Sequence, residues 1–160
     1  MIRKTLETRR IGRRDLMAMF GAGVVAAMGV SMVGKDAMAD GKMVADAVKK
    51  VTGGKDTGSG KITLDLPQIA ENGNTVPIAI DVASPMTDAD HVKALHVWAD
   101  KNPRPEVATF KFTPAGGKAK IATRIRLAKT QNIVAVAEMS DGSFQMAKSE
   151  IKVTIGGCGG

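Results

Sequence analysis

The stretch KIATRIRLAKTQNIVAVAEMSDG, residues 120–142, holds two different strand patterns in succession. In its first part apolar and polar side chains alternate, and this period of two predicts a strand with one buried face. Residues 132–138 are apolar on both faces, which is typical of a central strand that is covered on both sides. Asp141-Gly142 then gives a turn signal. The stretch therefore predicts two strands of a β-sheet protein.

Further strand patterns extend on the N-terminal side of this stretch. Residues 91–98 are again apolar on both faces, and shorter runs alternate with a period of two. Short strands of this number and spacing are typical of an immunoglobulin-like antiparallel β-sandwich, so we predict an all-β domain over residues 61–155. The alternating runs are 62–66, 76–82, 108–113 and 121–127, and the turn signals between runs are Asn72-Gly73, Ser84-Pro85, Asn102-Pro103, Pro114–Gly117 and Asp141-Gly142.

The last predicted strand changes its phase. Its apolar residues stand at even positions at the start, Phe144 and Met146, and at odd positions from Ile151 onward. A change of phase within one strand moves the apolar side chains to the other face. The sequence therefore predicts a β-bulge or kink between Ala147 and Glu150.

Residues 40–60 precede the sandwich and have a different character. Apolar residues recur at helical spacing and predict a short helix over 43–51, which Gly53-Gly54 would end. The segment 53–60 is rich in Gly, Thr, Ser and Lys, which predicts a flexible linker. The helical stripe consists of Met43, Val44, Ala47, Val48 and Val51.

Residues 1–39 have the organisation of a secretory signal peptide. A basic start is followed by the apolar run 16–33 and by Ala37-Met38-Ala39, a small-residue cleavage pattern. The pair Arg13-Arg14 directly before the apolar run indicates the twin-arginine route, so we predict a periplasmic protein. A retained membrane anchor is the alternative, because the run could nearly span a bilayer.

The charge of the chain resides largely in this leader. The whole chain has 23 basic and 16 acidic residues, and the leader contains 7 of the basic and 3 of the acidic ones. The remainder therefore has 16 basic and 13 acidic residues, a net charge of +3. The remainder has no basic run with interleaved aromatic residues. We therefore expect no nucleic-acid partner, and no membrane association after cleavage.

A single cysteine, Cys158, stands in the ending Gly156-Gly157-Cys158-Gly159-Gly160. One cysteine cannot form an internal disulfide, so in an exported protein it is an intermolecular partner or a free thiol with chemistry. Glycines have no side chains to bury and lose the most entropy when ordered, so we expect a mobile tail. Five extended residues reach about 17 Å. The pattern predicts a flexible carrier arm, residues 156–160, with Cys158 as the covalent attachment point.

The rest of the sequence offers little chemistry to this thiol. No residue adjacent to Cys158 is basic, so we expect partner enzymes to activate the thiol. We also expect no catalytic residue, cofactor or metal in this chain. His91 and His96 lie an odd number of residues apart on a predicted strand and would face opposite ways. An incidental cysteine on a disordered terminus and a disulfide-linked dimer are the alternatives that the residues leave open. The predicted core fillers are Met43, Met86, Met139 and Met146.

The ending Val153–Gly160 resembles the C-terminus of the SoxY family, the sulfur-carrying subunits of bacterial thiosulfate oxidation. The resemblance covers essentially the whole chain, with the Gly-Gly-Cys-Gly-Gly ending as its most specific part. It includes the leader, the helix and linker, and the stretches Asn72–Pro77, Ser84–Thr87, Thr123–Ala128 and Met139–Gly142.

The resemblance implies a substrate carrier rather than an enzyme. Cys158 would be the attachment point, and the arm would consist of Gly156, Gly157, Gly159 and Gly160. The immunoglobulin-like sandwich would pair with a second sandwich subunit, SoxZ. A c-type cytochrome enzyme, SoxAX, would join thiosulfate oxidatively to the cysteine. A hydrolase, SoxB, would release sulfate, and a molybdenum enzyme, SoxCD, would oxidise the remaining sulfur.

Two other functions compete with this interpretation. Ubiquitin-like sulfur carriers also end in Gly-Gly and form a terminal thiocarboxylate, but they need ATP, which an exported protein lacks. A structural immunoglobulin-like domain of the cell envelope would explain the strands and leave the tail unexplained.

Overall fold

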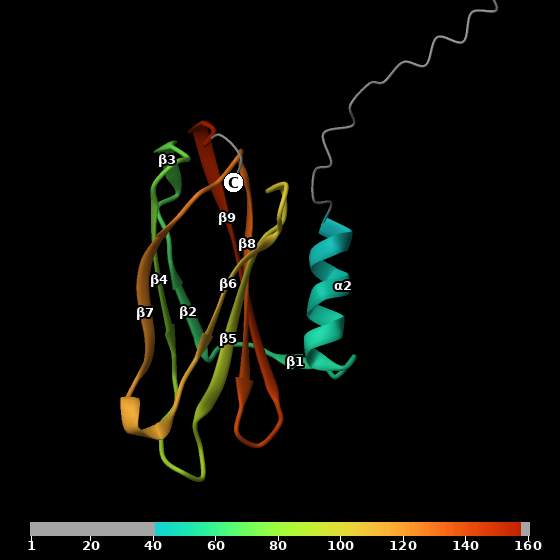
Figure 1. Ribbon diagram of the computed structural model, residues 1–160, viewed down its shortest axis with the longest axis vertical. Coiled ribbons are helices and arrows are strands. Elements are labelled where there is room, and N and C mark those ends of the chain that lie inside the picture. The colour runs from blue at the N-terminus through green and yellow to red at the C-terminus, as the bar shows by residue number, and fades with distance from the viewer. Residues whose placement is uncertain (1–40, 158–160) are drawn as a thin grey trace, which may run out of the picture. The chain divides into compact units, whose positions relative to one another are not determined.

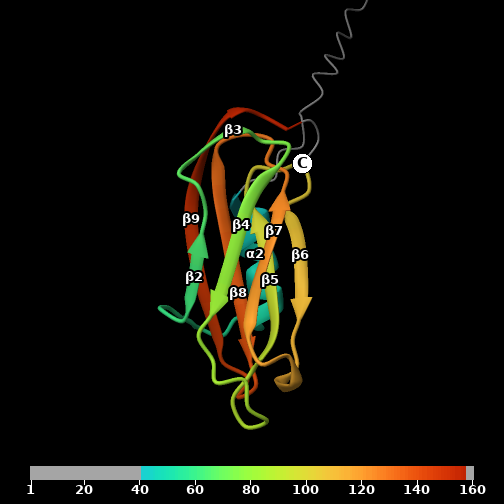
Figure 2. The same cartoon turned by 90° about the vertical axis from the view of Figure 1, so that its left-hand side faces the viewer.

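Two β-sheets that face one another form the body of the protein in the computed structural model, which describes residues 41–157 (Figure 1). The elements in chain order are α2 (Gly41–Thr52), β1 (Thr57–Gly58), β2 (Ile62–Asp65), β3 (Ile69–Asn72), β4 (Val76–Val82), β5 (Val92–Ala99), β6 (Glu106–Lys111), the 3-10 helix η1 (Pro114–Gly116), β7 (Ala119–Ile125), β8 (Gln131–Met139) and β9 (Phe144–Ile155). The larger sheet has the strand order β1-β9-β8-β5-β6, and β3 also pairs with β9. The smaller sheet has the order β2-β4-β7. Figure 2 shows the smaller sheet in front of the larger one.

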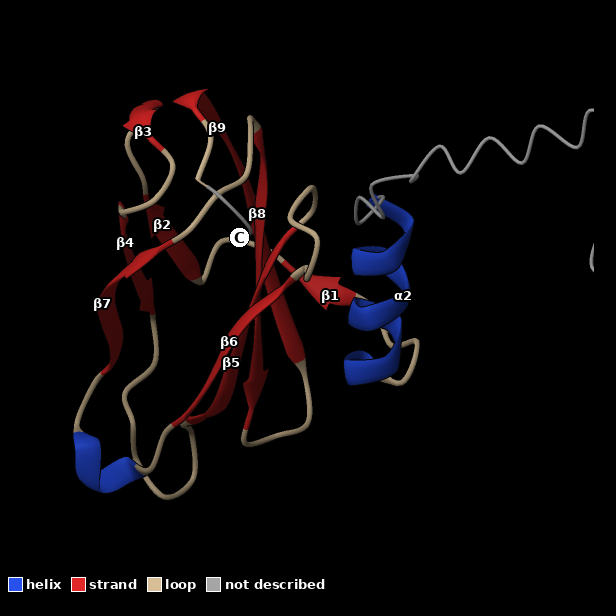
Figure 3. Ribbon diagram, turned by 45° about the horizontal axis from the view of Figure 1, so that its top comes forward, coloured by secondary structure: helices blue, strands red, loops and turns tan. Residues whose placement is uncertain are grey.

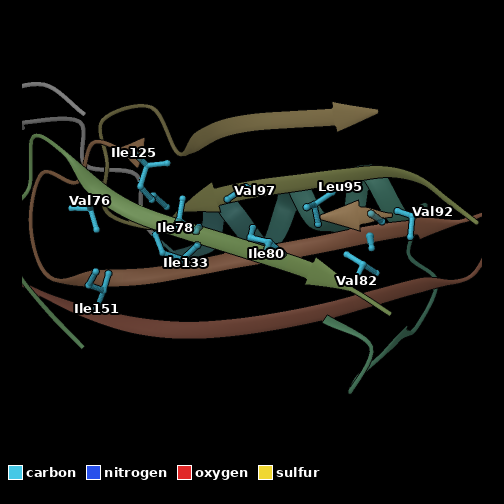
Figure 4. Close-up of a cluster of buried hydrophobic side chains, with 14 of the residues drawn as sticks. Val76, Ile78, Ile80, Val82, Val92, Leu95, Val97, Ile125, Ile133 and Ile151 are labelled. Carbon is cyan, nitrogen blue, oxygen red and sulfur yellow. The ribbon is translucent and has the colours of Figure 1, made fainter. Parts of the chain in front are cut away.

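The predicted sandwich and its two central strands are confirmed. The runs that are apolar on both faces became β5 and β8, which pair with one another in the middle of the larger sheet. Figure 4 shows core side chains of both sheets in one cluster, among them Ile80 of β4, Leu95 of β5 and Ile133 of β8. All three are fully buried, and burial of such a side chain contributes about 1.5–3 kcal/mol. Alternating strands such as β4 turn their apolar face toward this cluster.

Two short parallel pairings depart from the predicted antiparallel pattern. Strand β1 pairs with the start of β9, and β3 pairs with its end. The composition of residues 53–60 predicts a flexible linker, but Thr57 and Gly58 of this segment form β1, so the prediction is wrong for these two residues. Its backbone finds partners on the exposed edge of β9, because Thr57 and Gly58 lie beside Phe144 and Gln145. The sequence of residues 69–72 gives no strand signal. Strand β3 forms there through its pairing with the edge of β9.

The predicted bulge in the last strand is wrong. Strands β8 and β9 pair without a register shift from Gln131 opposite Ile151 to Glu138 opposite Phe144. The phase of the apolar residues changes because the two halves of β9 bury opposite faces. Phe144 packs on the outer face of the larger sheet, whereas Ile151 packs between the sheets.

Helix α2 covers the outer face of the larger sheet and explains this second buried side (Figure 3). Its apolar stripe packs on Trp98, Val134, Val136 and Phe144. Met43 and Met146 are exposed, so their prediction as core fillers is wrong, while Met86 and Met139 are buried as predicted. Within residues 41–157, the structure contains no helix with the length and apolarity needed to cross a membrane. The predicted signal peptide, residues 1–39, lies outside the described residues.

Candidate functional site

The base of the C-terminal tail is held by the sandwich. Strand β9 ends at Ile155, and Gly156 and Gly157 follow it without regular structure. Gly157 is buried, and its N–H donates a hydrogen bond of 2.9 Å to the carbonyl oxygen of Leu127. For these two glycines the prediction of a free arm is therefore wrong. A backbone needs no side chain to dock when another backbone supplies its hydrogen-bond partner.

Three backbone hydrogen bonds organise this site. The N–H of Gly73 donates to the carbonyl of Ile155 at 2.7 Å, and the N–H of Leu127 donates to the carbonyl of Gly73 at 2.7 Å. The bond from Gly157 to Leu127 completes the set. We call these four residues, Gly73, Leu127, Ile155 and Gly157, the tail cradle. It lies where β3 and β9 end side by side (Figures 1 and 3).

The cradle leaves no room for side chains at its glycines. A Cβ atom on Gly157 would lie 2.8 Å from the carbonyl oxygen of Gly73, closer than real Cβ contacts. A Cβ atom on Gly156 would collide with the carbonyl oxygen of Ala128, and one on Gly73 would collide with that of Leu127. All of these obstacles are backbone atoms, which cannot rotate away as a side chain can. These close approaches require glycine at Gly73 and Gly157 of the cradle and at the neighbouring Gly156.

A buried pair of amide side chains supports the cradle from inside. Asn102 is 3% exposed and Gln131 is fully buried, and the Nε2 of Gln131 donates to the Oδ1 of Asn102 at 2.8 Å. Asn102 also bonds to the backbone of Arg126 and Ala128, on either side of Leu127. The sequence indicated Asn102 only as part of a turn and gave no signal for Gln131 or Gly73 as members of a site. The contacts join segments distant in sequence, so no local pattern reveals them.

The comparison with protein families gives a match over most of the chain. The family profile described as sulfur oxidation protein SoxY matches residues 48–158, a range that includes the single cysteine. The chain belongs to the SoxY family. The resemblance predicted from the ending is thereby confirmed, while Cys158, Gly159 and Gly160 themselves lie outside the described residues.

A solved structure of the SoxY family agrees with this assignment. The sulfur carrier protein SoxY from Chlorobium limicola f thiosulfatophilum is 31% identical, and the match covers 70% of this chain and 96% of that one with a TM-score of 0.59. The comparison with curated protein sequences finds no match.

The sandwich itself also occurs outside the SoxY family. A superoxide reductase (neelaredoxin) from Ignicoccus hospitalis is 16% identical, with a TM-score of 0.53 over 59% of this chain and 80% of that one. A putative superoxide reductase from Thermotoga maritima is 18% identical, with a TM-score of 0.51 over 61% of this chain and 87% of that one. At such identities the likeness concerns the fold alone. Residues 41–157 contain no group of three or more His, Cys, Asp or Glu side chains that could hold a metal.

The fold brings basic residues of this SoxY-family chain close to the tail in space. Sequence reasoning found no basic neighbour of Cys158 along the chain. The segment that binds Gly157 carries Arg126 immediately before Leu127 and Lys129 two positions after it. Arg126 is exposed, and an exposed cation attracts anions to its surroundings.

The two histidines lie away from the tail cradle and have local partners. The Nδ1 of His91 lies 3.0 Å from the carbonyl oxygen of Thr87, and the Nδ1 of His96 lies 3.0 Å from the Oγ1 of Thr109. The ring of His96 also stacks on Trp98, with 5.7 Å between ring centroids. Burial lowers the pKa of His96, and the negative charges of Glu138 and Glu106 raise it by less. Both histidines therefore belong to local structure.

Proposed function

We propose that this chain is a carrier that holds thiosulfate-derived sulfur covalently on Cys158 and presents it to the enzymes of sulfur oxidation. The observation that carries the proposal is the SoxY family match, which extends to residue 158 and so includes the only cysteine. The related Chlorobium protein is a sulfur carrier. The chain itself acts as a substrate carrier and not as an enzyme.

In the proposed loading step, the Cys158 thiol and thiosulfate form a new sulfur–sulfur bond. The products are a Cys–S–S–SO₃⁻ adduct, one proton and two electrons. A c-type cytochrome of the SoxAX kind accepts the two electrons. Hydrolysis by a SoxB-like enzyme then uses one water, releases sulfate and two protons, and leaves a Cys–S–S⁻ persulfide. A SoxCD-like enzyme would oxidise that sulfur further.

The tail cradle supports this proposal by its position. Because Gly157 is hydrogen-bonded to Leu127, Cys158 directly follows a residue that the sandwich holds. We propose that Gly156 and Gly157 form the fixed base of the arm and that Gly159 and Gly160 complete it. The Cα atom of Cys158 is about 3.8 Å from that of Gly157. The thiol would therefore stay near one end of the sandwich while an enzyme approaches it.

The setting of the carrier is also a proposal. We propose that the leader directs export by the twin-arginine route and that the mature chain pairs with a SoxZ-like subunit in the periplasm. That route moves folded proteins, so a partner without a signal of its own would cross together with this chain. Replacing Arg13 and Arg14 by Lys should leave both proteins in the cytoplasm. Recovery of either protein from the periplasm of that variant would contradict the proposed route.

The carrier proposal is tested by intact-mass measurement of the protein from thiosulfate-grown cells. We expect adducts that a thiol reductant removes, and none in Cys158→Ser or Cys158→Ala. These variants should unfold at the same urea concentration as the unsubstituted chain. Reductant-sensitive adducts that persist in Cys158→Ser would overturn the proposal. An adduct on the terminal carboxyl group instead would favour a thiocarboxylate carrier.

A further inference from the structure

We propose that Asn102 is a positioning residue that sets where the carrier tail leaves the sandwich. The inference rests on the proposed carrier function of Cys158 and extends it to a residue of the fold. Asn102 lies in the loop after β5 and is 3% exposed. A buried amide needs hydrogen-bond partners, and two partners of Asn102 flank Leu127, the residue that binds the base of the tail.

The partners of Asn102 lie on both sides of one residue of the tail cradle. Its Nδ2 donates to the carbonyl oxygen of Arg126 at 2.9 Å, and its Oδ1 accepts from the N–H of Ala128 at 2.9 Å. The backbone before and after Leu127 is thereby held by one rigid side-chain amide. The carbonyl of Leu127 is in turn the acceptor for the N–H of Gly157. The direction of that carbonyl, and with it the tail base, depends on Asn102.

Gln131 fixes the orientation of Asn102. The Nε2 of Gln131 donates to the Oδ1 of Asn102, and its Oε1 accepts from the N–H of Lys101 at 2.9 Å. Among the described residues, no buried side-chain nitrogen or oxygen lacks a hydrogen-bond partner. A rotation of either amide would leave buried groups unpaired, at a cost of about 1–3 kcal/mol for each group. The pair therefore has a single favourable arrangement.

A fixed exit point matters because the remaining tail is short. Cys158 directly follows Gly157, and consecutive Cα atoms lie about 3.8 Å apart, so a change in the direction of departure moves the thiol by a large part of its range. Misplacement of a reacting group by about 1 Å can lower a rate by about 100-fold. Asn102 thus acts on loading through Leu127 and Gly157, without contact to the sulfur.

The test compares Asn102→Ala with Asp100→Ala. Asp100 is another buried side chain close by in the sequence, and its carboxylate accepts two hydrogen bonds, from the backbone and the side chain of Asn132. In Asn102→Ala we expect the amide of Gly157 to exchange with solvent at least about tenfold faster, and the fraction of sulfur-loaded chain in thiosulfate-grown cells to fall at least about fivefold. Asp100→Ala should change neither. The rate at which iodoacetamide alkylates Cys158 should stay within about twofold in both variants.

A second variant keeps the test decisive if Asn102→Ala does not fold. Asn102→Asp keeps the volume and the acceptor for Ala128 and Gln131, but it replaces the donor to the Arg126 carbonyl with a carboxylate oxygen that repels this carbonyl. We expect faster exchange at Gly157 in this variant as well. Unchanged exchange at Gly157 in the folded Asn102 variant, or equal acceleration in Asp100→Ala, would overturn the inference. So would faster exchange with normal loading. Absence of adducts on the unsubstituted chain would overturn the carrier function itself, whatever the exchange at Gly157.

Discussion

Gly53 and Gly54 end helix α2 with positive φ angles of 64° and 79° and have open space where a Cβ atom would lie. Gly156 and Gly157 show the opposite combination, because they need no positive φ and the space for a Cβ atom is occupied by backbone. The first pair is glycine for the sake of backbone conformation, and the second for the sake of close approach. Composition alone made both segments resemble flexible linkers. Substitutions at the two pairs should differ in how much stability they remove and in which replacement residue is tolerated best.

The largest effect is expected at Gly73, the cradle member that contacts both neighbours. In Gly73→Ala the Cβ atom meets the carbonyl of Leu127 and lies 2.7 Å from the nitrogen of Gly157. Two backbone segments must move, and overpacking of this kind costs about 1–3 kcal/mol. We expect a loss of about 3 kcal/mol in the free energy of unfolding, measured with urea. A loss below about 0.5 kcal/mol would show that the cradle can open without cost.

A smaller loss of stability, with a clear local signature, is expected at Gly157. Gly157→Ala should detach the tail base and remove one hydrogen bond, worth about 1 kcal/mol. The amide of residue 157 should then exchange at the rate of an unprotected peptide. Gly157→Asn should behave like Gly157→Ala, because the obstacle is space and not conformation. Milder behaviour of the asparagine variant would indicate that φ matters here as well.

The helix end should give the reverse order of the two substitutions. At Gly53 the cost comes from the left-handed conformation, about 1 kcal/mol for alanine and less for asparagine, which tolerates that region. Urea unfolding of Gly53→Ala and Gly53→Asn measures the difference directly. Equal losses for the two variants would remove the contrast with Gly157.

The smallest expected effect concerns charge near the tail. Arg126→Gln should slow alkylation of Cys158 by iodoacetate, an anion, by about twofold and leave the neutral iodoacetamide unaffected, since nearby cations concentrate anions. Lys55→Gln is the control with the same loss of charge. Lys55 bonds to the carbonyl of Gly142, at the opposite end of the 12-residue strand β9, well beyond the screening length of about 10 Å. Equal slowing in both variants would assign the effect to net charge.

Local patterns predicted the parts of the fold that local burial decides. Strands β5 and β8 were predictable because apolar residues occupy both of their faces. The phase change in β9 predicts a bulge that the strand does not have, because the sequence does not show that Phe144 is covered by α2. The tail cradle could not be predicted at all. It consists of backbone contacts between residues 73, 127 and 157, and a backbone contact leaves no trace in the identity of Leu127.

The most direct test of the account is the sulfur-loaded fraction of four chains isolated from thiosulfate-grown cells by intact-mass measurement. The unsubstituted chain and Gly53→Ala should carry reductant-sensitive adducts at equal levels, because Gly53 affects only the end of α2. Gly157→Ala should keep its thiol and carry at least about fivefold less adduct, and Cys158→Ser should carry none. Adducts on Cys158→Ser, or equal loading of Gly157→Ala and Gly53→Ala, would contradict the claim that a held glycine base presents Cys158 as the carrier thiol.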